Sequence, residues 1–263
     1  MSLQNGVRAD ALMQIRLDLK DFANERKLKL SYMPFFIKAA SLALTEFPSL
    51  NALIDEKLEN VVYKASHNIC VAMDTPGGLV VPNIKHCEQS KDVISETGDA
   101  KEEATYTSKQ NVTTVDNSTI TRALLTENRE DIAIPAAGSI FDIASELQRL
   151  QEDGMRERIS REDLTDGTFT ISNIGTIGGT YASPIIFPPQ LAIGALGKIE
   201  KLPRYDSNNS LVPMHIFKVS WAADHRVIDG ATIARFSNRW KFYVEHPSAM
   251  LAQLKLTTIT EQN

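Results

Sequence analysis

The most constraining feature of this chain is a change of apolar periodicity within residues 217–243. The first half alternates, as is typical of a strand with one buried face, through Phe217, Val219, Trp221 and Ala223. The second half repeats at helical spacing, through Ile233, Phe236, Trp240 and Tyr243. His225 lies between the two halves, on the parity of the apolar face if the strand continues that far. A histidine at such a junction can exchange a proton near neutral pH, so we expect a catalytic base there.

Apolar stripes elsewhere predict helices at 11–26, 33–46 and 139–154, and the second is apolar almost all round, so we expect it to be buried. Short apolar runs predict strands at 61–64, 68–74, 79–85, 167–171, 190–199 and 215–223. The run Thr75-Pro76-Gly77-Gly78 predicts a tight hairpin turn. Because these elements do not alternate regularly as strand–helix–strand units, the predicted fold class is α+β, with a mixed β-sheet flanked by helices.

Charge and composition narrow the classes of function. The 263 residues carry a net charge of -5 with a pI of about 5.6, which gives no electrostatic support to a nucleic-acid partner. Cys70 and Cys87 have no Cys/His cluster beside them, so we expect neither a metal site nor a disulfide, and a reducing compartment fits best. No apolar run reaches the roughly 18 residues that would predict a membrane span, and the first residues show no leader pattern.

Residues 86–138 differ in character from the rest of the chain. They cluster Thr, Ser, Asn, Glu and Lys and contain few aromatic residues. A connector of that length in a compact domain is usually functional or disordered, and we interpret this one as a disordered insert. The predicted organisation is a single domain over residues 11–256 that the insert interrupts, with a separate segment at 1–10 and a tail at 257–263.

Each candidate site residue also has a purely structural interpretation. His225 could be a satisfied core histidine, with Asp229 as the N-cap of the following helix. Ser172 ends a predicted strand before a glycine-rich turn, where most serines are only structural. Its surroundings lack Gly-x-Ser-x-Gly, so a hydrolase nucleophile is not supported, whereas a serine that donates to a developing oxyanion fits better. The glycines that follow do not form a dinucleotide-binding pattern.

Two stretches together resemble the acyltransferases of the 2-oxo acid dehydrogenase complexes, a family that shares its signature with chloramphenicol acetyltransferase. The first is His225-x-x-x-Asp229-Gly230 after a Ser-Trp-Ala-Ala-Asp strand, and the second is the Phe-Thr-Ile-Ser-Asn-Ile-Gly run at 169–175. Further matching stretches lie at 29–36, 64–68, 73–75, 81–83 and 139–144, and the resemblance covers about residues 11–85 and 139–256. Within the family, the sequence is most similar to the members that transfer branched-chain acyl groups.

The resemblance implies a chloramphenicol acetyltransferase-like two-layer sandwich that associates as homotrimers, which build a larger hollow core. It implies transfer of a branched-chain acyl group between a dihydrolipoyl arm and coenzyme A, in a channel between neighbouring subunits. In such a site His225 takes the proton from the attacking thiol, Ser172 hydrogen-bonds the oxyanion, and Asp229 fixes local structure through an ion pair. The positions that match the family's coenzyme A contacts are Arg16, Ser31, Asp74, Gln151, Ser172, Asn173, Gly197 and Ile199.

The resemblance also sets expectations about partners. Coenzyme A enters as a substrate, and the lipoyl group belongs to a separate domain that these residues do not include. The other implied partners are the decarboxylase and dihydrolipoamide dehydrogenase components of the complex, and eukaryotic members of the family reside in the mitochondrial matrix. Two alternatives stay open: a scaffold that assembles without turnover, and the same transfer with acetyl or succinyl groups.

Two departures from the family pattern bear on these expectations. Residues 1–10 do not match the strand that normally precedes the first helix, and a missing strand would expose a sheet edge or weaken subunit contacts. About 50 residues separate Lys85 from Ser139, where the family has only a few. Loop entropy adds only about 0.6 kcal/mol per doubling of length, so the expected danger from this insert is a steric one at the subunit contact.

Overall fold

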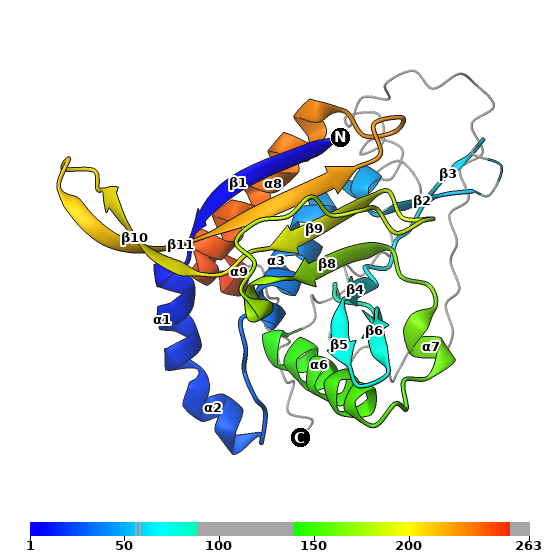
Figure 1. Cartoon of the computed structure of the whole chain (residues 1–263), viewed down its shortest axis with the longest axis horizontal. Helices are drawn as coiled ribbons and strands as arrows, with labels where there is room; N and C mark the ends of the chain where they lie inside the picture. The colour runs from blue at the N-terminus through cyan, green and yellow to red at the C-terminus, as the bar shows by residue number, and fades with distance from the viewer. Residues whose placement is uncertain (56, 58, 89–138, 253–263) are drawn as a thin grey trace, which may run out of the picture.

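The computed structural model describes residues 1–55, 57, 59–88 and 139–252 (Figure 1). The strands of its main sheet are β1 (Ser2–Arg8), β4 (Ile69–Val71), β7 (Asn83–Ile84), β8 (Phe169–Asn173), β9 (Ala192–Leu196), β10 (Glu200–Tyr205) and β11 (Leu211–Ala223). Their order is β1-β11-β9-β8-β4-β7, with β10 paired to β11. β8 runs parallel to β4 and β9, whereas the other pairs are antiparallel. The sheet is therefore mixed, as predicted.

Two small antiparallel sheets accompany the main one. β2 (Ala52–Ile54) pairs with β3 (Val61–Tyr63), and β5 (Met73–Thr75) pairs with β6 (Gly78–Val80). The turn between β5 and β6 is the predicted hairpin, and the Thr75 hydroxyl donates to the Gly78 carbonyl at 2.6 Å. The single strand predicted at 68–74 is wrong, because Ala72 separates β4 in the main sheet from β5 in this hairpin.

Helices pack against one face and the ends of the sheet. They are α1 (Asp10–Asp18), α2 (Lys20–Glu25), α3 (Met33–Glu46), α6 (Ile140–Met155), α7 (Arg161–Leu164), α8 (Gly230–Glu245) and α9 (Pro247–Ala252), with 3-10 turns η1 (Pro48–Leu50) and η2 (Gly175–Ile177). α3 has the predicted bounds and is buried along most of its length. α6 begins with a capping box, in which Ser139 and Asp142 each accept from the other's backbone N–H. α3 and α8 lie side by side behind the sheet in Figure 1.

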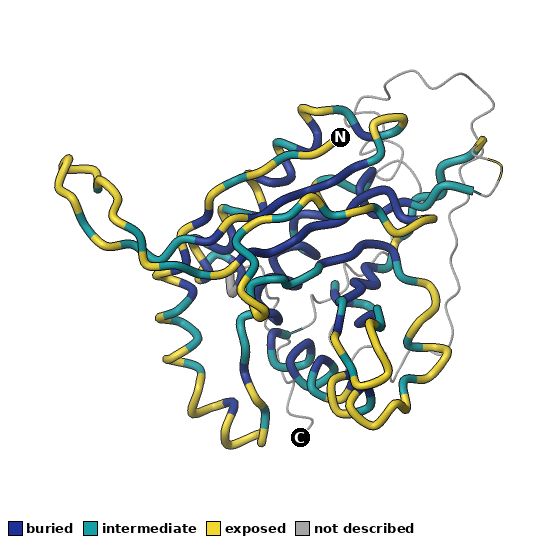
Figure 2. Tube along the Cα trace, in the orientation of Figure 1, coloured by how far each residue is buried: buried dark blue, intermediate teal, exposed yellow. Residues whose placement is uncertain are grey.

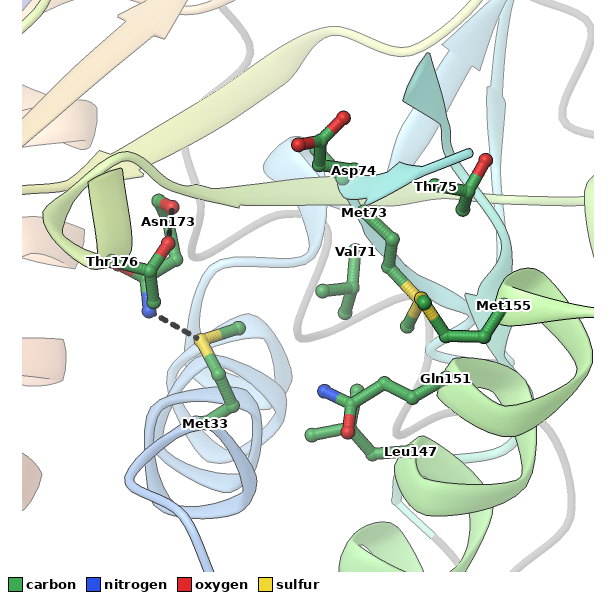
Figure 3. Close-up of a pocket in the computed structure, with 11 residues that line it drawn as sticks. Met33, Val71, Met73, Asp74, Thr75, Leu147, Gln151, Met155, Asn173 and Thr176 are labelled. Carbon is green, nitrogen blue, oxygen red and sulfur yellow. Dashed lines mark hydrogen bonds between the residues drawn. The ribbon is translucent and has the colours of Figure 1, made fainter. Parts of the chain in front are cut away.

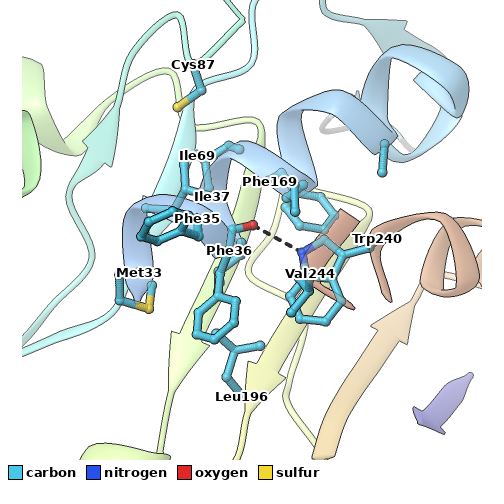
Figure 4. Packing of buried hydrophobic residues seen from close by; sticks show 14 of the residues in the cluster. Met33, Phe35, Phe36, Ile37, Ile69, Cys87, Phe169, Leu196, Trp240 and Val244 are labelled. Atoms are coloured by element: carbon cyan, nitrogen blue, oxygen red, sulfur yellow. Dashed lines mark hydrogen bonds between the residues drawn. The ribbon is translucent and has the colours of Figure 1, made fainter. Parts of the chain in front are cut away.

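The centre of the core is a set of aromatic rings between the sheet and these two helices (Figure 4). The rings of Trp221 and Trp240 meet edge to face, with centroids 5.3 Å apart. The Trp240 indole donates to the Phe36 carbonyl at 3.1 Å, and the Trp221 indole donates to the Ser237 hydroxyl at 3.0 Å. Figure 2 shows the buried residues running along the central strands and the inner sides of the helices. β11 and α8, which flank His225, are therefore both anchored in the core.

The first ten residues contain a strand that the sequence did not predict. Ser2–Arg8 form β1, which pairs antiparallel with β11 from Ser2 opposite Ala222 to Arg8 opposite Ile216. The expectation that this segment supplies no strand is wrong, because a polar residue lies on its inward parity and hides the alternation. Asn5 is that residue, and its side-chain amide reaches α8, where it donates to Asn238 at 3.2 Å.

The prediction of one continuous helix at 11–26 is also wrong. Leu19 separates α1 from α2, and it caps the end of one and the start of the other. The predicted apolar stripe is only partly buried, since Leu12 is fully buried whereas Phe22 is 58% exposed. A helix that buries so little has weak tertiary support, so two short helices replace one long helix.

Several expectations fall outside the part of the chain that the structure describes. They are the insert at 86–138, of which only residues 86–88 are described, and the tail at 257–263. Across the described residues, no helix has the length and apolar character that would let it cross a bilayer. The same residues contain no group of three or more His, Cys, Asp or Glu side chains placed to hold a metal ion.

Candidate active site

His225 lies in the turn that joins β11 to α8, and it is exposed. β11 ends at Ala223 because the Asp224 carbonyl turns the chain, accepting from the N–H groups of Val227 at 3.2 Å and Ile228 at 2.8 Å. The strand thus stops before His225, and the interpretation of this residue as a core histidine is wrong. Within the described residues, its imidazole has no hydrogen-bond partner, so both ring nitrogens are free to meet a ligand.

Asp229 is the N-cap of α8, as its helix-opening interpretation predicted. Its carboxylate accepts from the Thr232 backbone N–H at 2.7 Å and from the Thr232 hydroxyl at 2.9 Å. The bond from the Thr232 backbone holds the pKa of the Asp229 carboxyl below its ordinary value. Among the described side chains, none forms an ion pair with Asp229, so the expected ion pair is corrected to a helix cap.

Ser172 and Asn173 end β8 beside the pocket described next. Ser172 is half-buried, and its hydroxyl has no hydrogen-bond partner in the described part of the chain. The Asn173 side-chain oxygen accepts from the Gly175 N–H at 3.1 Å, which starts the following turn. A Cβ at Gly175 would lie 2.7 Å from the backbone of Gly197, so glycine is required where this turn crosses the end of β9. That crossing brings Gly197 next to the turn that follows Ser172.

A pocket of about 380 Å³ opens between α3, the β5–β6 hairpin and α6 (Figure 3). Three predicted coenzyme A positions line it together, namely Asp74, Gln151 and Asn173. Gln151 points from α6 into the space that faces Met33 of α3. The other lining residues are mostly apolar, including Met33, Val71, Met73, Leu147 and Met155. Apolar walls with a few polar groups suit a slender ligand that carries amides, and methionines adapt readily to such a shape.

The remaining predicted contacts are not among the residues that line this pocket. Arg16 donates from Nε to the Leu30 carbonyl at 2.8 Å, and its guanidinium lies 5.1 Å from the centroid of the Tyr32 ring. Ser31 accepts from the Met33 N–H at 3.4 Å, so both residues adjoin the pocket through the start of α3. Ile199 follows β9 on the Gly197 side and is half-buried against the core.

The sheet places Ser172 and His225 at opposite ends of their strands. Ser172 lies level with Ala195 of β9, and Ala195 lies opposite Ser220 of β11. β11 then runs on, away from the Ser172 end, before the chain reaches His225; Figure 1 shows the arrowheads of β8 and β11 pointing in opposite directions. With strand rises of about 3.3 Å per residue and spacings of about 4.8 Å, the Cα atoms of Ser172 and Ala223, where β11 ends, are on the order of 14 Å apart, and His225 lies two residues beyond that end. One copy of the chain therefore cannot bring both side chains to the same reacting atom.

Sequence reasoning missed some residues of this site. Met33, Met73 and Met155 share the pocket, but they lie on three elements that are far apart in the sequence. The neighbours of His225 were also missed, since the Arg226 side chain pairs with Asp224 across it. The only available signal was that these charged residues directly flank the histidine in Asp224-His225-Arg226.

The chain matches the family described as 2-oxoacid dehydrogenases acyltransferase (catalytic domain) over residues 1–122 and 134–252. The chain therefore belongs to this family of acyltransferase catalytic domains, which confirms the resemblance that the two motifs indicated. The match begins at residue 1 and so includes β1.

Two curated relatives of this chain carry the same name. The lipoamide acyltransferase component of branched-chain alpha-keto acid dehydrogenase complex, mitochondrial, of Caenorhabditis elegans is 58% identical over 249 residues, which are 95% of this chain and 45% of the relative. The protein of the same name from Bos taurus is 46% identical over 244 residues, 93% of this chain and 41% of the relative. The chain thus spans less than half the length of these relatives.

A solved structure supports the architecture. The cubic core of the pyruvate dehydrogenase multienzyme complex has a TM-score of 0.72 to this chain at 24% sequence identity, over 95% of this chain and 83% of the other. At that identity the likeness shows the fold, and it confirms the mixed sheet with flanking helices.

Proposed function

We propose that this chain transfers a branched-chain acyl group between a dihydrolipoyl arm and coenzyme A. The support is its membership of the acyltransferase family and its 58% identity to a mitochondrial branched-chain lipoamide acyltransferase. The proposed setting is accordingly the mitochondrial matrix. The lipoyl arm would arrive on a separate domain, and the decarboxylase and dihydrolipoamide dehydrogenase components of the complex would load and reoxidise it.

His225 serves as the general base in this proposal. The attacking thiol gives its proton to the imidazole as its sulfur forms a bond to the thioester carbonyl carbon. The Ser172 hydroxyl donates to the oxygen on which negative charge develops. The old carbon–sulfur bond then breaks, and the departing thiolate takes the proton back from His225. General base assistance contributes roughly 100- to 10,000-fold in rate, and one oxyanion donor contributes about 3 kcal/mol.

Coenzyme A fits the pocket at the start of α3. Its amide-bearing arm would lie among the methionines, with Asp74, Gln151 and Asn173 as hydrogen-bond partners. Arg16 and Ser31 adjoin the same end of α3, where a guanidinium suits a phosphate group by its geometry. Ser172, Gly197 and Ile199 then line the route from this pocket toward the reacting thioester.

The observation that carries the proposal is the separation of Ser172 from His225 within one copy. Both groups must reach the same reacting centre within about 3 Å, so a second copy has to supply one of them. We therefore place the active site between neighbouring copies of a homotrimer. A closed ring of identical head-to-tail contacts forms one such site at every contact, and the relative with the matching fold forms a cubic core.

An exposed apolar loop offers the surface for this contact. It follows the Ser172 turn and presents Ile177, Tyr181, Ile185 and Phe187, which are 52% to 88% exposed. Apolar groups gathered in this way on one loop mark an interaction surface. Because the loop continues directly from Ser172, a second copy seated on it would bring its own His225 turn toward this end of the sheet.

Mixing two inactive variants tests this arrangement. His225→Ala removes the base and Ser172→Ala removes the oxyanion donor, with losses in kcat of at least about 100-fold and little change in KM. If the two variants are unfolded together and reassembled in equal amounts, about a quarter of the sites receive both natural side chains from different copies. Acyl transfer from isobutyryl-dihydrolipoamide to coenzyme A should then recover to that fraction of the wild-type rate.

Three results would count against the proposal. Recovery that never exceeds the sum of the separate variants would show that both residues act within one copy, or that they do not act at all. A wild-type chain that transfers acetyl or succinyl groups faster than isobutyryl groups would reassign the substrate. A wild-type assembly without any turnover would favour a scaffold.

A further inference from the structure

The loop that carries His225 is held by an unusual concentration of bonds to one residue. The Asp224 N–H donates to the Leu191 carbonyl at 2.9 Å, which ties the loop to the buried start of β9. The Asp224 carbonyl accepts from Val227 and Ile228, as described above. The Asp224 carboxylate binds Arg226. Asp224 therefore takes part in each of these bonds at the start of the loop.

The carboxylate of Asp224 makes two different kinds of bond to Arg226. Oδ1 accepts from the Arg226 backbone N–H at 3.0 Å, which closes a turn with His225 as its middle residue. The guanidinium also donates to both carboxylate oxygens, from Nε at 3.0 Å and 3.1 Å and from Nη2 to Oδ2. This fork is a bidentate arginine–carboxylate pair, the strongest geometry for such an ion pair. The side chain of Asp224 is 17% exposed and that of Arg226 is 55% exposed.

These bonds matter because the imidazole itself is not held by any described side chain. The far side of the loop is anchored as well, since Ile228 is buried and Asp229 caps α8. The backbone of this turn therefore sets the Cα–Cβ direction of His225 and limits its rotamers, and Asp224 holds that backbone. A misplacement of about 1 Å at a catalytic group can lower a rate by about 100-fold.

We propose that Asp224 is a positioning residue for His225, which it holds in a catalytic direction by closing the turn through the Arg226 N–H, with the guanidinium as a second clamp. The inference rests on the proposed role of His225 as the base. The backbone bond is the main element, because Asp and Asn have the side-chain length that favours a bond to the backbone two residues onward, whereas Glu is one methylene longer. The competing explanation is that Arg226 contacts a substrate and Asp224 only orients it.

Three substitutions in the full chain separate these effects. Asp224→Asn keeps the acceptor for the Arg226 N–H but loses the charge; Asp224→Glu keeps the charge but is too long for the turn; Asp224→Ala loses both. We expect kcat to fall by about 10- to 100-fold in the Ala and Glu variants, to stay within about threefold in the Asn variant, and KM for coenzyme A to stay within about twofold in all of them. Hydrogen exchange at the Arg226 amide should speed up in the Ala and Glu variants only.

Asp163 provides a matched control. It completes the capping box of α7, whose N-cap is Ser160, by accepting from the Ser160 N–H at 3.3 Å, and it pairs with Arg149 at 2.6 Å, so it likewise combines a backbone bond with an arginine pair, away from the His225 turn. Asp163→Ala should lower stability in a similar way without changing kcat.

The outcomes separate this inference from the proposed function. An active wild type whose Asp224→Ala variant keeps its kcat overturns only the positioning role. A rise in KM with kcat unchanged assigns Asp224 and Arg226 to substrate binding instead, and a loss of kcat without faster exchange also overturns the turn-based explanation. A wild type without acyl transfer, or a fully active His225→Ala variant, removes the proposed function and this inference with it.

Discussion

Two histidines of this chain show how burial decides what a titratable side chain can do. His225 is exposed, and no described side chain binds its ring, so it can meet a substrate. His67 is 6% exposed, its Nδ1 lies 3.0 Å from the Ser41 hydroxyl, and its backbone N–H donates to Glu88 at 2.7 Å. Burial lowers the pKa of His67 from 6.5 to about 4, because the interior disfavours the charged ring. His67 is thus a neutral structural residue.

This burial predicts a pH dependence of stability. Between pH 6.5 and 4 the unfolded chain binds a proton at His67 and the folded chain does not, so stability is complete above pH 6.5 and falls by roughly 3 kcal/mol toward pH 4. His67→Asn cannot titrate there, and its unfolding free energy should change less over this interval. Urea unfolding at several pH values measures the difference, with the exposed His246→Asn as control. Parallel curves for wild type and His67→Asn would contradict the prediction.

At the residue scale, the sequence identified candidate site residues more readily than the partners that their side chains bind. Residue type and motif spacing led to His225 and Ser172 as candidates, whereas Asp74, Gln151 and Asn173 came from the resemblance to the acyltransferase family, and the structure brings these three to one pocket. The ion pair expected for Asp229 was wrong, since a carboxylate at a helix start has backbone donors closer than any arginine.

At the scale of elements, close packing fixes the middle of the sheet. β9 lies between β8 and β11, and its Gly194 is covered by the ring of Trp221. A Cβ added there would come 2.3 Å from that ring, so the two central strands depend on glycine at this position. Gly6 of β1 is the opposite case, because a Cβ there would meet nothing within 4 Å.

This contrast gives a matched pair of substitutions. Gly194→Ala forces Trp221 or the strand to move, and overpacking of this kind should lower the free energy of unfolding by about 1–3 kcal/mol. Gly6→Ala adds the same methyl group to a strand without a clash and should change stability by less than about 0.5 kcal/mol. Guanidinium unfolding of both variants provides the measurement, and equal stabilities would show that the core around Trp221 accommodates the methyl group.

Element prediction succeeded where the apolar pattern was strong. α3 was predicted at its true bounds because almost every face is buried, and the helix after Ser139 was predicted from its apolar stripe, while its capping box is seen only in the structure. β1 and β10 were missed because their faces are mostly polar or exposed, and pairing with β11 rather than their own pattern makes them strands.

At the scale of the whole molecule, the fold class followed from the order of elements, but the active site could not. The sheet order β1-β11-β9-β8 depends on long-range pairing that local patterns do not contain, and this order separates Ser172 from His225. The resemblance alone implied a site between subunits, and the strand directions add a geometric reason for proposing one.

The proposed assembly predicts that the chain sediments as a trimer or larger, and that this depends on the exposed apolar loop. Ile185 is 88% exposed on the apolar loop, and a carboxylate there would have to be buried unpaired in a subunit contact. Ile185→Asp should sediment as a monomer without acyl transfer, whereas Ile185→Leu, which keeps the apolar surface, should remain a trimer or larger. A wild-type chain that sediments as a fully active monomer would contradict both the contact and the shared site.

The opposed ends of β8 and β11 have a consequence for mixtures of sound and faulty polypeptides. If every catalytic centre draws one group from each of two neighbours, a copy damaged in both groups spoils the centres on either side of it. Turnover then declines with the square of the sound fraction rather than in proportion to it. A defective allele would accordingly be partly dominant-negative, even while the normal polypeptide is still made.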